Sequence, residues 1–244
     1  MIRVGIGGWS YEPWEESFYP PKLAAAKQLE YASSKVTAIE INATFYRTQS
    51  AQSFKKWAAS TPDDFMFSVK APRAAVQRKD LREAKDSIEW FFNSGVSELG
   101  SKLGPIFWQL APYKKFDAAE MIAYFDMLPD KVKKLSLRHA LEVRHASFQD
   151  EAFLKLARER NIAVVTVESE KHPLIAEPTA DFAYARLERT QADEPTGYSK
   201  PALKAWAKTA RAWEKGGEVF LYFISGAKER NPAAAMAMLD MLKA

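Results

Sequence analysis

The chain has 244 residues, of which 47% are hydrophobic and 27% charged, and its formal net charge is +4. This composition is typical of a folded globular protein and excludes intrinsic disorder, collagen and a coiled coil. The absence of cysteine excludes disulfides, thiolate catalysis and cysteine-ligated metal centres. The positive excess is too small to indicate nucleic acid by itself. Because no long apolar run and no signal-peptide pattern is present, we expect a cytoplasmic protein that does not interact with membranes.

Eight short apolar runs, rich in β-branched residues, predict β-strands. They cover residues 2–6, 36–41, 65–69, 106–110, 140–144, 162–167, 182–187 and 218–223. Helical patterns separate most of them, at residues 22–34, 50–60, 81–99, 117–128, 150–160, 200–215 and 231–243. The stretch 168–181 has two prolines and little periodicity, so we expect a loop or a single turn there.

Strands that alternate with helices predict a parallel sheet, and eight such units in about 244 residues predict a closed (β/α)8 TIM barrel. We therefore expect one domain over residues 1–244, with the sixth helix short or absent. An open doubly wound sheet is the alternative. Its dinucleotide fingerprint fails, because Ser10 stands where G-x-G-x-x-G requires its last glycine.

The candidate site follows from the strand ends, because barrel enzymes place their active sites at the C-terminal ends of the strands. Glu40, Glu142 and Arg144 interrupt apolar strands, and buried charges are costly unless they are paired. Residues two apart share a strand face, so Glu142 faces the same way as Arg144, and Glu40 as Asn42. We favour a substrate site with a carboxylate base and an arginine clamp. An ion network that merely closes the top of the barrel is the alternative.

Other side chains at the strand ends complete this hypothesis. Lys70, Arg144 and Arg186 would hold an anion, and Glu40 or Glu142 would be the general base. His145 would transfer a proton or orient Glu40. The predicted substrate-binding residues are Trp9, Tyr11, Asn42, Tyr46, Lys70, Arg73, Gln109, Arg144 and Arg186.

Two residue clusters in the loops after the strands each have two interpretations. The basic residues between Lys70 and Lys85 indicate either an anion, such as a phosphate or a nucleic-acid backbone, or a solvated helix face. The aromatic residues of the first two loops are either a stacking platform for bases or sugars, or packing over the barrel mouth. These aromatic residues are Trp9, Tyr11, Trp14, Phe18, Tyr19, Phe45 and Tyr46.

Metal binding has little support in the sequence. Of the three histidines, His145 alone ends a predicted strand. Together with Glu40, Glu142 and Glu168 it could hold Mg²⁺ or Mn²⁺, but metal-binding barrels collect more such ligands, so we expect no metal and no other cofactor. Three functions remain open: an enzyme for a small anionic or phosphorylated substrate, a nucleic-acid-binding or processing protein, and a non-catalytic binding barrel.

Five motifs, in order along the chain, resemble the domain-of-unknown-function 72 family, the YecE-like proteins. They are Gly8–Tyr11 with Trp14 and Phe18–Pro20, Ile39–Tyr46, Phe65–Arg73, Leu103–Leu110 and Glu142–Phe148. The resemblance covers essentially the whole chain. It implies a TIM-barrel fold and a site at the residues above, and it implies no reaction, because that family has no established activity.

The chain departs from the family pattern in four loops. The family usually has Thr-His where residues 74–75 read Ala-Ala, and His-Gly where residues 188–189 read Glu-Arg. It usually has aspartate at Glu168, and two asparagines where residues 224–225 read Ile-Ser. Two histidines and two amides expected near the mouth are therefore replaced, which implies either a changed substrate or a loss of catalysis with binding retained.

Overall fold

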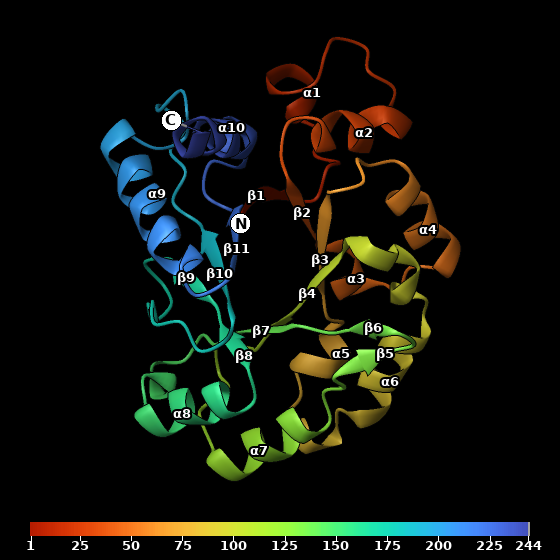
Figure 1. The fold of residues 1–244 in the computed structure, drawn as a ribbon, viewed down its shortest axis with the longest axis vertical. Helices are drawn as coiled ribbons and strands as arrows, with labels where there is room; N and C mark the ends of the chain where they lie inside the picture. The colour runs from red at the N-terminus through yellow and green to blue at the C-terminus, as the bar shows by residue number, and fades with distance from the viewer. Residues whose placement is uncertain (244) are drawn as a thin grey trace.

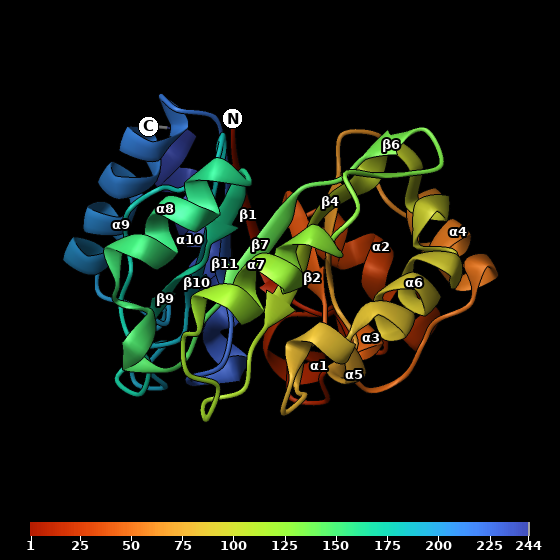
Figure 2. The same ribbon diagram turned by 90° about the horizontal axis from the view of Figure 1, so that it is seen from below.

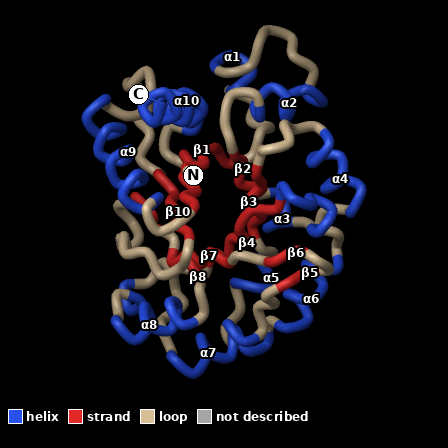
Figure 3. The backbone as a smooth tube through the Cα atoms, viewed as in Figure 1, coloured by secondary structure: helices blue, strands red, loops and turns tan. Residues whose placement is uncertain are grey.

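The computed structural model describes residues 1–243, and its strands form an inner ring that the helices surround (Figures 1 and 3). Neighbouring strands of the ring are parallel and follow the order β8-β7-β4-β3-β2-β1-β11-β10-β9. They are β1 (Ile2–Gly7), β2 (Ala38–Ile41), β3 (Met66–Lys70), β4 (Leu103–Gln109), β7 (His139–Glu142), β8 (Ile162–Val164), β9 (Thr166–Glu168), β10 (Phe182–Leu187) and β11 (Glu218–Phe223). This arrangement confirms the predicted TIM barrel.

The barrel closes through its sixth strand, which is split in two. β8 pairs with β7 and β9 pairs with β10, while Val165 lies between the two pieces. The backbone N–H of Val165 still donates to the carbonyl of Leu141 at 2.9 Å, so the ladder with β7 continues across the break. The nine strand pieces of the ring thus correspond to the eight strands that the sequence predicts.

Ten α-helices occur within residues 1–243, several of them shorter than two turns. They are α1 (Trp14–Ser17), α2 (Gln28–Ser33), α3 (Ala43–Tyr46), α4 (Ala51–Ala59), α5 (Arg73–Val76), α6 (Lys85–Asn93), α7 (Ala118–Asp126), α8 (Glu151–Glu159), α9 (Lys200–Glu214) and α10 (Asn231–Lys243). Side chains of Ser50, Asp117, Asp150 and Ser199 cap four of these helices by accepting backbone N–H groups. None of the helices in this part of the chain has the length and apolar character needed to cross a bilayer.

Five short 3-10 turns also occur within residues 1–243, and the first three overlap segments predicted as longer helices. These turns are η1 (Ala25–Lys27), η2 (Leu81–Glu83), η3 (Val96–Lys102), η4 (Ala146–Phe148) and η5 (Lys228–Arg230). The predicted helix over residues 81–99 is divided into η2, α6 and η3. Gly95, which adopts a left-handed conformation with φ 110°, separates α6 from η3. The predicted helix over 22–34 begins as η1 and continues as α2. As expected, residues 169–181 form no helix.

An antiparallel hairpin precedes the fifth barrel strand and was not predicted from the sequence. It consists of β5 (Lys131–Val132) and β6 (Leu135–Ser136), and each strand is too short to show an alternating pattern. It lies at the end of the barrel opposite α1, α3 and α5 (Figure 2). The next strand, β7, ends at Glu142 and not at residue 144 as predicted, so Arg144 belongs to the loop at the mouth.

Side chains alternate between the barrel interior and the layer beneath the helices, because successive residues of a strand face opposite sides. In β4, Phe107 faces the interior while Trp108 packs against Phe92 and Tyr124 of the surrounding helices. The interior cluster consists of Ala38, Phe107, Ala140, Ala163, Val165, Val167, Phe182, Tyr184, Phe220, Tyr222 and Ile224. Aromatic rings therefore fill much of the barrel below its mouth.

Three charged residues occupy the N-terminal end of the barrel, and we call them the N-terminal ion cluster (Arg3, Arg138 and Glu218). Nε of Arg3 lies 2.9 Å from Oε1 of Glu218, and Nη1 of Arg138 lies 2.6 Å from Oε2. The guanidinium of Arg138 also covers the ring of Phe220 at 4.8 Å. Burial tends to raise the pKa of Glu218, but the hydrogen bonds from both arginines lower it overall.

Candidate functional site

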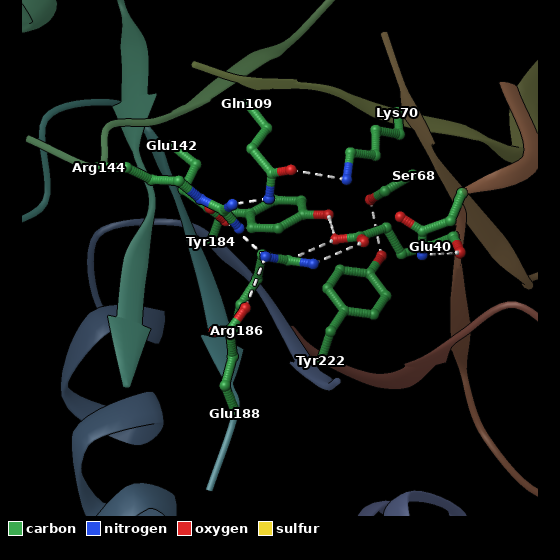
Figure 4. Close-up of polar contacts among 11 residues, drawn as sticks. Glu40, Ser68, Lys70, Gln109, Glu142, Arg144, Tyr184, Arg186, Glu188 and Tyr222 are labelled. Atoms are coloured by element: carbon green, nitrogen blue, oxygen red, sulfur yellow. Dashed lines mark hydrogen bonds and ion pairs between the residues drawn. The ribbon is translucent and has the colours of Figure 1, made fainter. Parts of the chain in front are cut away.

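A network of charged and polar side chains fills the opposite end of the barrel, at the C-terminal ends of the strands (Figure 4). We call this set the mouth network, and it consists of Glu40, Lys70, Gln109, Glu142, Arg144, Arg186 and Glu188. The register of the sheet brings these residues together: Gln109 lies beside Glu142 on the neighbouring strand, and Glu40 beside Ser68. The structure thus assembles most of the charged residues that the sequence predicted at the mouth.

Arg186 is the centre of the mouth network, and its side chain is almost completely buried. Its Nη1 lies 2.6 Å from Glu142 and 2.8 Å from Glu188, and its Nε lies 3.2 Å from Glu40. Burial lowers the pKa of Arg186, but the three carboxylates raise it overall and keep the guanidinium charged. This residue, expected to hold a ligand, uses most of its N–H groups on carboxylates of the protein.

Glu142 is fully buried and receives hydrogen bonds from three sides. Gln109 Nε2 donates at 2.8 Å and Arg144 Nε at 2.5 Å to one oxygen, while Arg186 occupies the other. Burial tends to raise the pKa of Glu142, but the charges of Arg186 and Arg144 lower it to about 2. Glu142 is therefore ionised at neutral pH and weakly basic, which makes it a poor general base.

Lys70 ends β3 and reaches into the mouth across aromatic rings. Its Nζ donates to Oε1 of Gln109 at 2.8 Å, and it lies 4.4 Å from the ring centre of Phe45 and 5.5 Å from that of Phe107. Burial and the neighbouring charge of Arg186 lower the pKa of Lys70 to about 8. Its ammonium group can therefore lose a proton close to neutral pH.

Glu40 rests on a floor of aromatic side chains. The hydroxyl of Tyr184 donates to Oε2 of Glu40 at 2.7 Å, and the ring of Tyr184 stacks on Phe107 with centroids 5.5 Å apart. Beside it, the Tyr222 hydroxyl and Ser68 Oγ share a hydrogen bond of 2.7 Å. These rings exclude water from the lower side of the mouth network and strengthen its electrostatic interactions.

Glu188 is the third carboxylate on Arg186 and lies just after the end of β10. Burial raises the pKa of Glu188, whereas the charge of Arg186 opposes that rise. The mouth network therefore contains a carboxyl group and an amino group, on Glu188 and Lys70, that are both shifted toward their neutral forms. Such shifts in a strand-end cluster are typical of groups that transfer protons.

The aromatic residues of the first loop pack away from the mouth network. The indole of Trp9 contacts Trp57 edge-on at 5.1 Å, in the layer beneath α4. Tyr11 lies under the ammonium of Lys228 at 4.1 Å, and the buried Trp14 donates from Nε1 to the Lys228 carbonyl at 2.9 Å. For Trp9 and Trp14 these contacts are those of packing.

Asn42 and His145 lie at the mouth but make local contacts. Asn42 Nδ2 donates to the backbone carbonyl of Glu40 at 3.3 Å. His145 Nδ1 accepts the backbone N–H of Ser147 at 3.1 Å and so caps η4. Because Tyr184 and the central arginine hold the Glu40 carboxylate, the structure does not give His145 the orienting role expected of it.

Tyr46 and Arg73, also predicted to bind substrate, line a separate groove beside the mouth network. The groove has a volume of about 730 Å³ and lies between residues of α3, α5 and α6. Neither residue contacts the mouth carboxylates through a hydrogen bond or ion pair in residues 1–243. The candidate binding residues therefore separate into two neighbouring sites.

The metal alternative depended on Glu168, which the structure places elsewhere. Its carboxylate lies outside the barrel interior. It accepts hydrogen bonds from Nε1 of Trp206 on α9, at 3.1 Å, and from the hydroxyl of Tyr198. Within residues 1–243, no three acidic or histidine side chains gather in a way that would hold a metal ion. Glu40 and Glu142 are paired with arginine, an arrangement that does not suit a cation.

The predicted site did not include several residues that the structure places at the mouth. Tyr184 and Glu188 flank Arg186 at two-residue spacing, so strand alternation could have placed both beside it. Tyr222 lies opposite Arg186 on the neighbouring strand, and only the register of the two strands shows that they are neighbours. His172 has no sequence signal; its Nδ1 is buried without a hydrogen-bond partner among the described residues, and burial and the charge of Arg144 lower its pKa.

The model of the family described as "Protein of unknown function DUF72" matches residues 3–244. The UPF0759 protein YunF of Bacillus subtilis (strain 168) is 30% identical over 184 residues, which represent 73% of this chain and 61% of that protein. The chain thus spans about three fifths of the length of this curated relative.

Two solved structures resemble the whole barrel. A DUF72 family protein from Thermotoga maritima MSB8 is 25% identical, with full coverage of both chains and a TM-score of 0.83. Another, from Enterococcus faecalis V583, is 17% identical over 100% of this chain and 96% of that chain, with a TM-score of 0.80. The likeness therefore covers both ends of the barrel and its helical layer.

Proposed function

The chain belongs to the DUF72 family of proteins of unknown function, and we propose that it is an enzyme acting on a small anionic or phosphorylated substrate at the barrel mouth. The observation that carries the proposal is the buried mouth network, in which three carboxylates and three cations meet at the strand ends. Strand ends are where barrels of this fold perform chemistry.

Arg144 and Lys70 are the residues we assign to anion binding. Arg144 uses Nε on Glu142, and its side chain is partly exposed, so its Nη groups remain for a ligand. Lys70 uses one N–H on Gln109 and keeps two further donors. A guanidinium and an ammonium at the same end of the barrel can bind phosphate or carboxylate groups through charge-assisted hydrogen bonds.

Glu188 and Lys70 are the residues we assign to proton transfer. The sequence suggested Glu40 or Glu142 as the base, but the low pKa of Glu142 makes it inefficient near neutral pH. The two oxygens of Glu40 are already occupied by Tyr184 and Arg186. The raised pKa of Glu188 and the lowered pKa of Lys70 bring both groups nearer to the pH at which general acids and bases work best.

Thermal unfolding against a panel of anions tests the binding step. The panel contains inorganic phosphate, sugar phosphates and small carboxylates, at low and high salt. A ligand at 100 times its Kd stabilises a protein by about 2.7 kcal/mol, which raises Tm by roughly 5–10 °C for a chain of this size. We expect one class of anion to give this rise in the wild type and none in Arg144→Gln. Arg160→Gln, at the exposed end of α8, is the matched control and keeps the full rise.

Turnover of the stabilising anion tests the chemical step. We expect Glu188→Gln to lower kcat by about 10²- to 10⁴-fold, the usual contribution of a general acid or base, with little change in KM. Full activity in Glu188→Gln would remove this residue from the mechanism. Stabilisation by an anion that the protein never converts would favour the non-catalytic binding barrel instead.

A further inference from the structure

A groove lies beside the mouth network, between residues of α3, α5 and α6, and we call it the α3–α5 groove. Its volume of about 730 Å³ lies in the range of small-molecule sites. One wall includes Phe45, whose ring also covers the ammonium of Lys70 at 4.4 Å. The groove therefore opens next to the mouth network, and Phe45 separates the two.

Two large aromatic side chains line this groove and remain exposed to solvent. Tyr46 is 82% exposed and Trp90 58% exposed, although rings of this size normally bury most of their surface. Tyr46 packs edge-on against Phe45 with centroids 5.0 Å apart, which leaves a face of its ring free. Exposed aromatic faces in a groove are suited to stacking on a planar group of a ligand.

The groove is positively charged. Arg47 and Arg73 line it, and none of the described residues that line it is acidic. Nε of Arg73 donates to Oε1 of Gln77 at 2.8 Å, which holds the guanidinium at the wall of the groove. Within residues 1–243, neither arginine forms an ion pair with a carboxylate, so both charges are available to an anion.

We propose that the α3–α5 groove binds a nucleotide unit, with the base stacked on Trp90 or Tyr46 and the phosphate held by Arg47 and Arg73. A neutral sugar would leave both arginines without a partner, and inorganic phosphate would leave both rings unused. An aromatic base joined to a phosphate uses both features of the groove. The inference goes beyond the proposed function and does not depend on it, because it requires no chemistry at the mouth network.

Calorimetric titration of the full chain tests the proposal, with AMP, ribose 5-phosphate and inorganic phosphate as probes. AMP is expected to bind more tightly than ribose 5-phosphate, because only AMP carries a base. Trp90→Ala or Tyr46→Ala is expected to weaken AMP about 5- to 150-fold, the usual loss for one stacking ring, and to leave ribose 5-phosphate unchanged. Arg73→Gln is expected to weaken both ligands.

Two control variants separate this groove from the mouth network. Tyr113→Ala removes an exposed aromatic ring that does not line the groove, and Arg144→Gln alters the mouth network. Both are expected to bind AMP as the wild type does. If Arg144→Gln abolishes AMP binding while Trp90→Ala and Tyr46→Ala retain it, the nucleotide binds at the mouth and the proposal is wrong.

An oligonucleotide distinguishes the two sources of a nucleotide. Tighter binding of an eight-residue oligothymidylate than of AMP, with affinity that falls steeply as salt rises, would identify a nucleic-acid strand as the ligand. Equal or weaker binding of the strand would identify a free nucleotide. Failure of both AMP and the oligonucleotide to bind would overturn the proposal, whatever the anion panel shows for the mouth network.

Discussion

The two ends of the barrel both carry arginine–carboxylate pairs, but they differ in the direction of the pKa shifts of their charged groups. At the N-terminal ion cluster, two arginines bind the single carboxylate of Glu218, whose pKa is lowered overall. The carboxylate there is stabilised in its charged form. In the mouth network, Glu142 is likewise stabilised as an anion, whereas Lys70 and Glu188 are shifted toward their neutral forms.

The number of cationic partners explains this difference. Burial is the largest single influence on the pKa of Glu218, but the hydrogen bonds and charges of two guanidinium groups together outweigh it. Glu142 is fully buried and needs two arginines as well, which leaves Glu188 to share Arg186 with two other carboxylates. Lys70 and Glu188 belong to the same hydrogen-bonded and ion-paired network at the mouth, which is why the proposed proton transfer is assigned to that end.

Removal of Arg186 is expected to have the largest effect. Arg186→Met leaves three carboxylates without their shared partner, and breaking a buried pair in this way costs about 3–5 kcal/mol of unfolding free energy. The corresponding fall in Tm is roughly 6–20 °C. Urea and thermal unfolding measure both. The loss is expected to shrink as pH falls, because protonation of the unpaired carboxylates relieves their repulsion.

Arg138→Met is the matched control for that variant. It removes one arginine from the N-terminal ion cluster, where Glu218 keeps Arg3 and remains partly exposed. We expect a smaller loss with little dependence on pH above 5. Equal losses in the two variants would mean that the mouth network is no more sensitive to loss of a charge than the N-terminal ion cluster, and that the two ends do not differ in this respect.

The pH dependence of stability is expected to show the next largest effect, through Glu142. Its folded pKa of about 2 lies below the ordinary value of 4.5, so it contributes stability that is present above pH 4.5 and lost as pH falls toward 2. The size of this contribution is on the order of 3 kcal/mol. Urea unfolding between pH 6 and 2.5 should show it as an acid-side loss that Glu142→Gln lacks. An unchanged acid-side loss in the variant would show that Glu142 is not the group responsible.

The pKa of Lys70 can be measured directly, as the titration of a single group. Burial and Arg186 lower its folded pKa from 10.5 to about 8, so this lysine makes stability rise with pH between those values. In protein labelled with ¹³C at lysine Cε, one resonance should titrate near pH 8 and disappear in Lys70→Arg. A midpoint near 10.5 for that resonance would show that its ammonium is well solvated, and would remove Lys70 from proton transfer.

The sequence predicted the barrel well because its signal is repeated. Eight apolar strands and the helices between them give many independent indications of one topology, and an error of two residues at a strand end, as at Arg144, leaves that topology unchanged. The sequence did not predict the hairpin at residues 131–136 or the kink at Gly95, because each depends on a few residues with no periodic pattern.

The site was predicted less completely, because strand ends show which residues approach the mouth but not which atoms meet. Charged residues within apolar strands indicated Glu40, Glu142 and Arg144, and the strand ends added Arg186. In the structure Arg186 pairs with both Glu40 and Glu142. Arg186 pairs with carboxylates of the protein, whereas the sequence predicted that it holds a ligand. The spacing of residues along the chain does not show which side-chain atoms meet. Trp9 was expected at the mouth because it follows a strand end, yet its ring packs beneath α4.

The smallest expected effect distinguishes two carboxylates that share one arginine. Burial raises the folded pKa of Glu188 above its unfolded value, so this group contributes stability that is present below pH 4.5 and lost as pH rises through its folded pKa. The contribution of Glu142 to stability has the opposite pH dependence, because its folded pKa is lowered. The effect of Glu188 is smaller, because the charge of Arg186 opposes the effect of burial.

Unfolding of Glu188→Gln and the wild type from pH 4 to 7 measures this difference. The glutamine does not titrate, so the stability of the wild type relative to Glu188→Gln should fall as pH rises, whereas relative to Glu142→Gln it should increase as pH rises from 2.5 to 4.5. Slopes of the same sign would mean that both carboxylates are held as anions, as at the N-terminal ion cluster. Opposite slopes would show that one arginine pairs with a carboxyl group of lowered pKa and another of raised pKa, which is the arrangement that the proposed proton transfer uses.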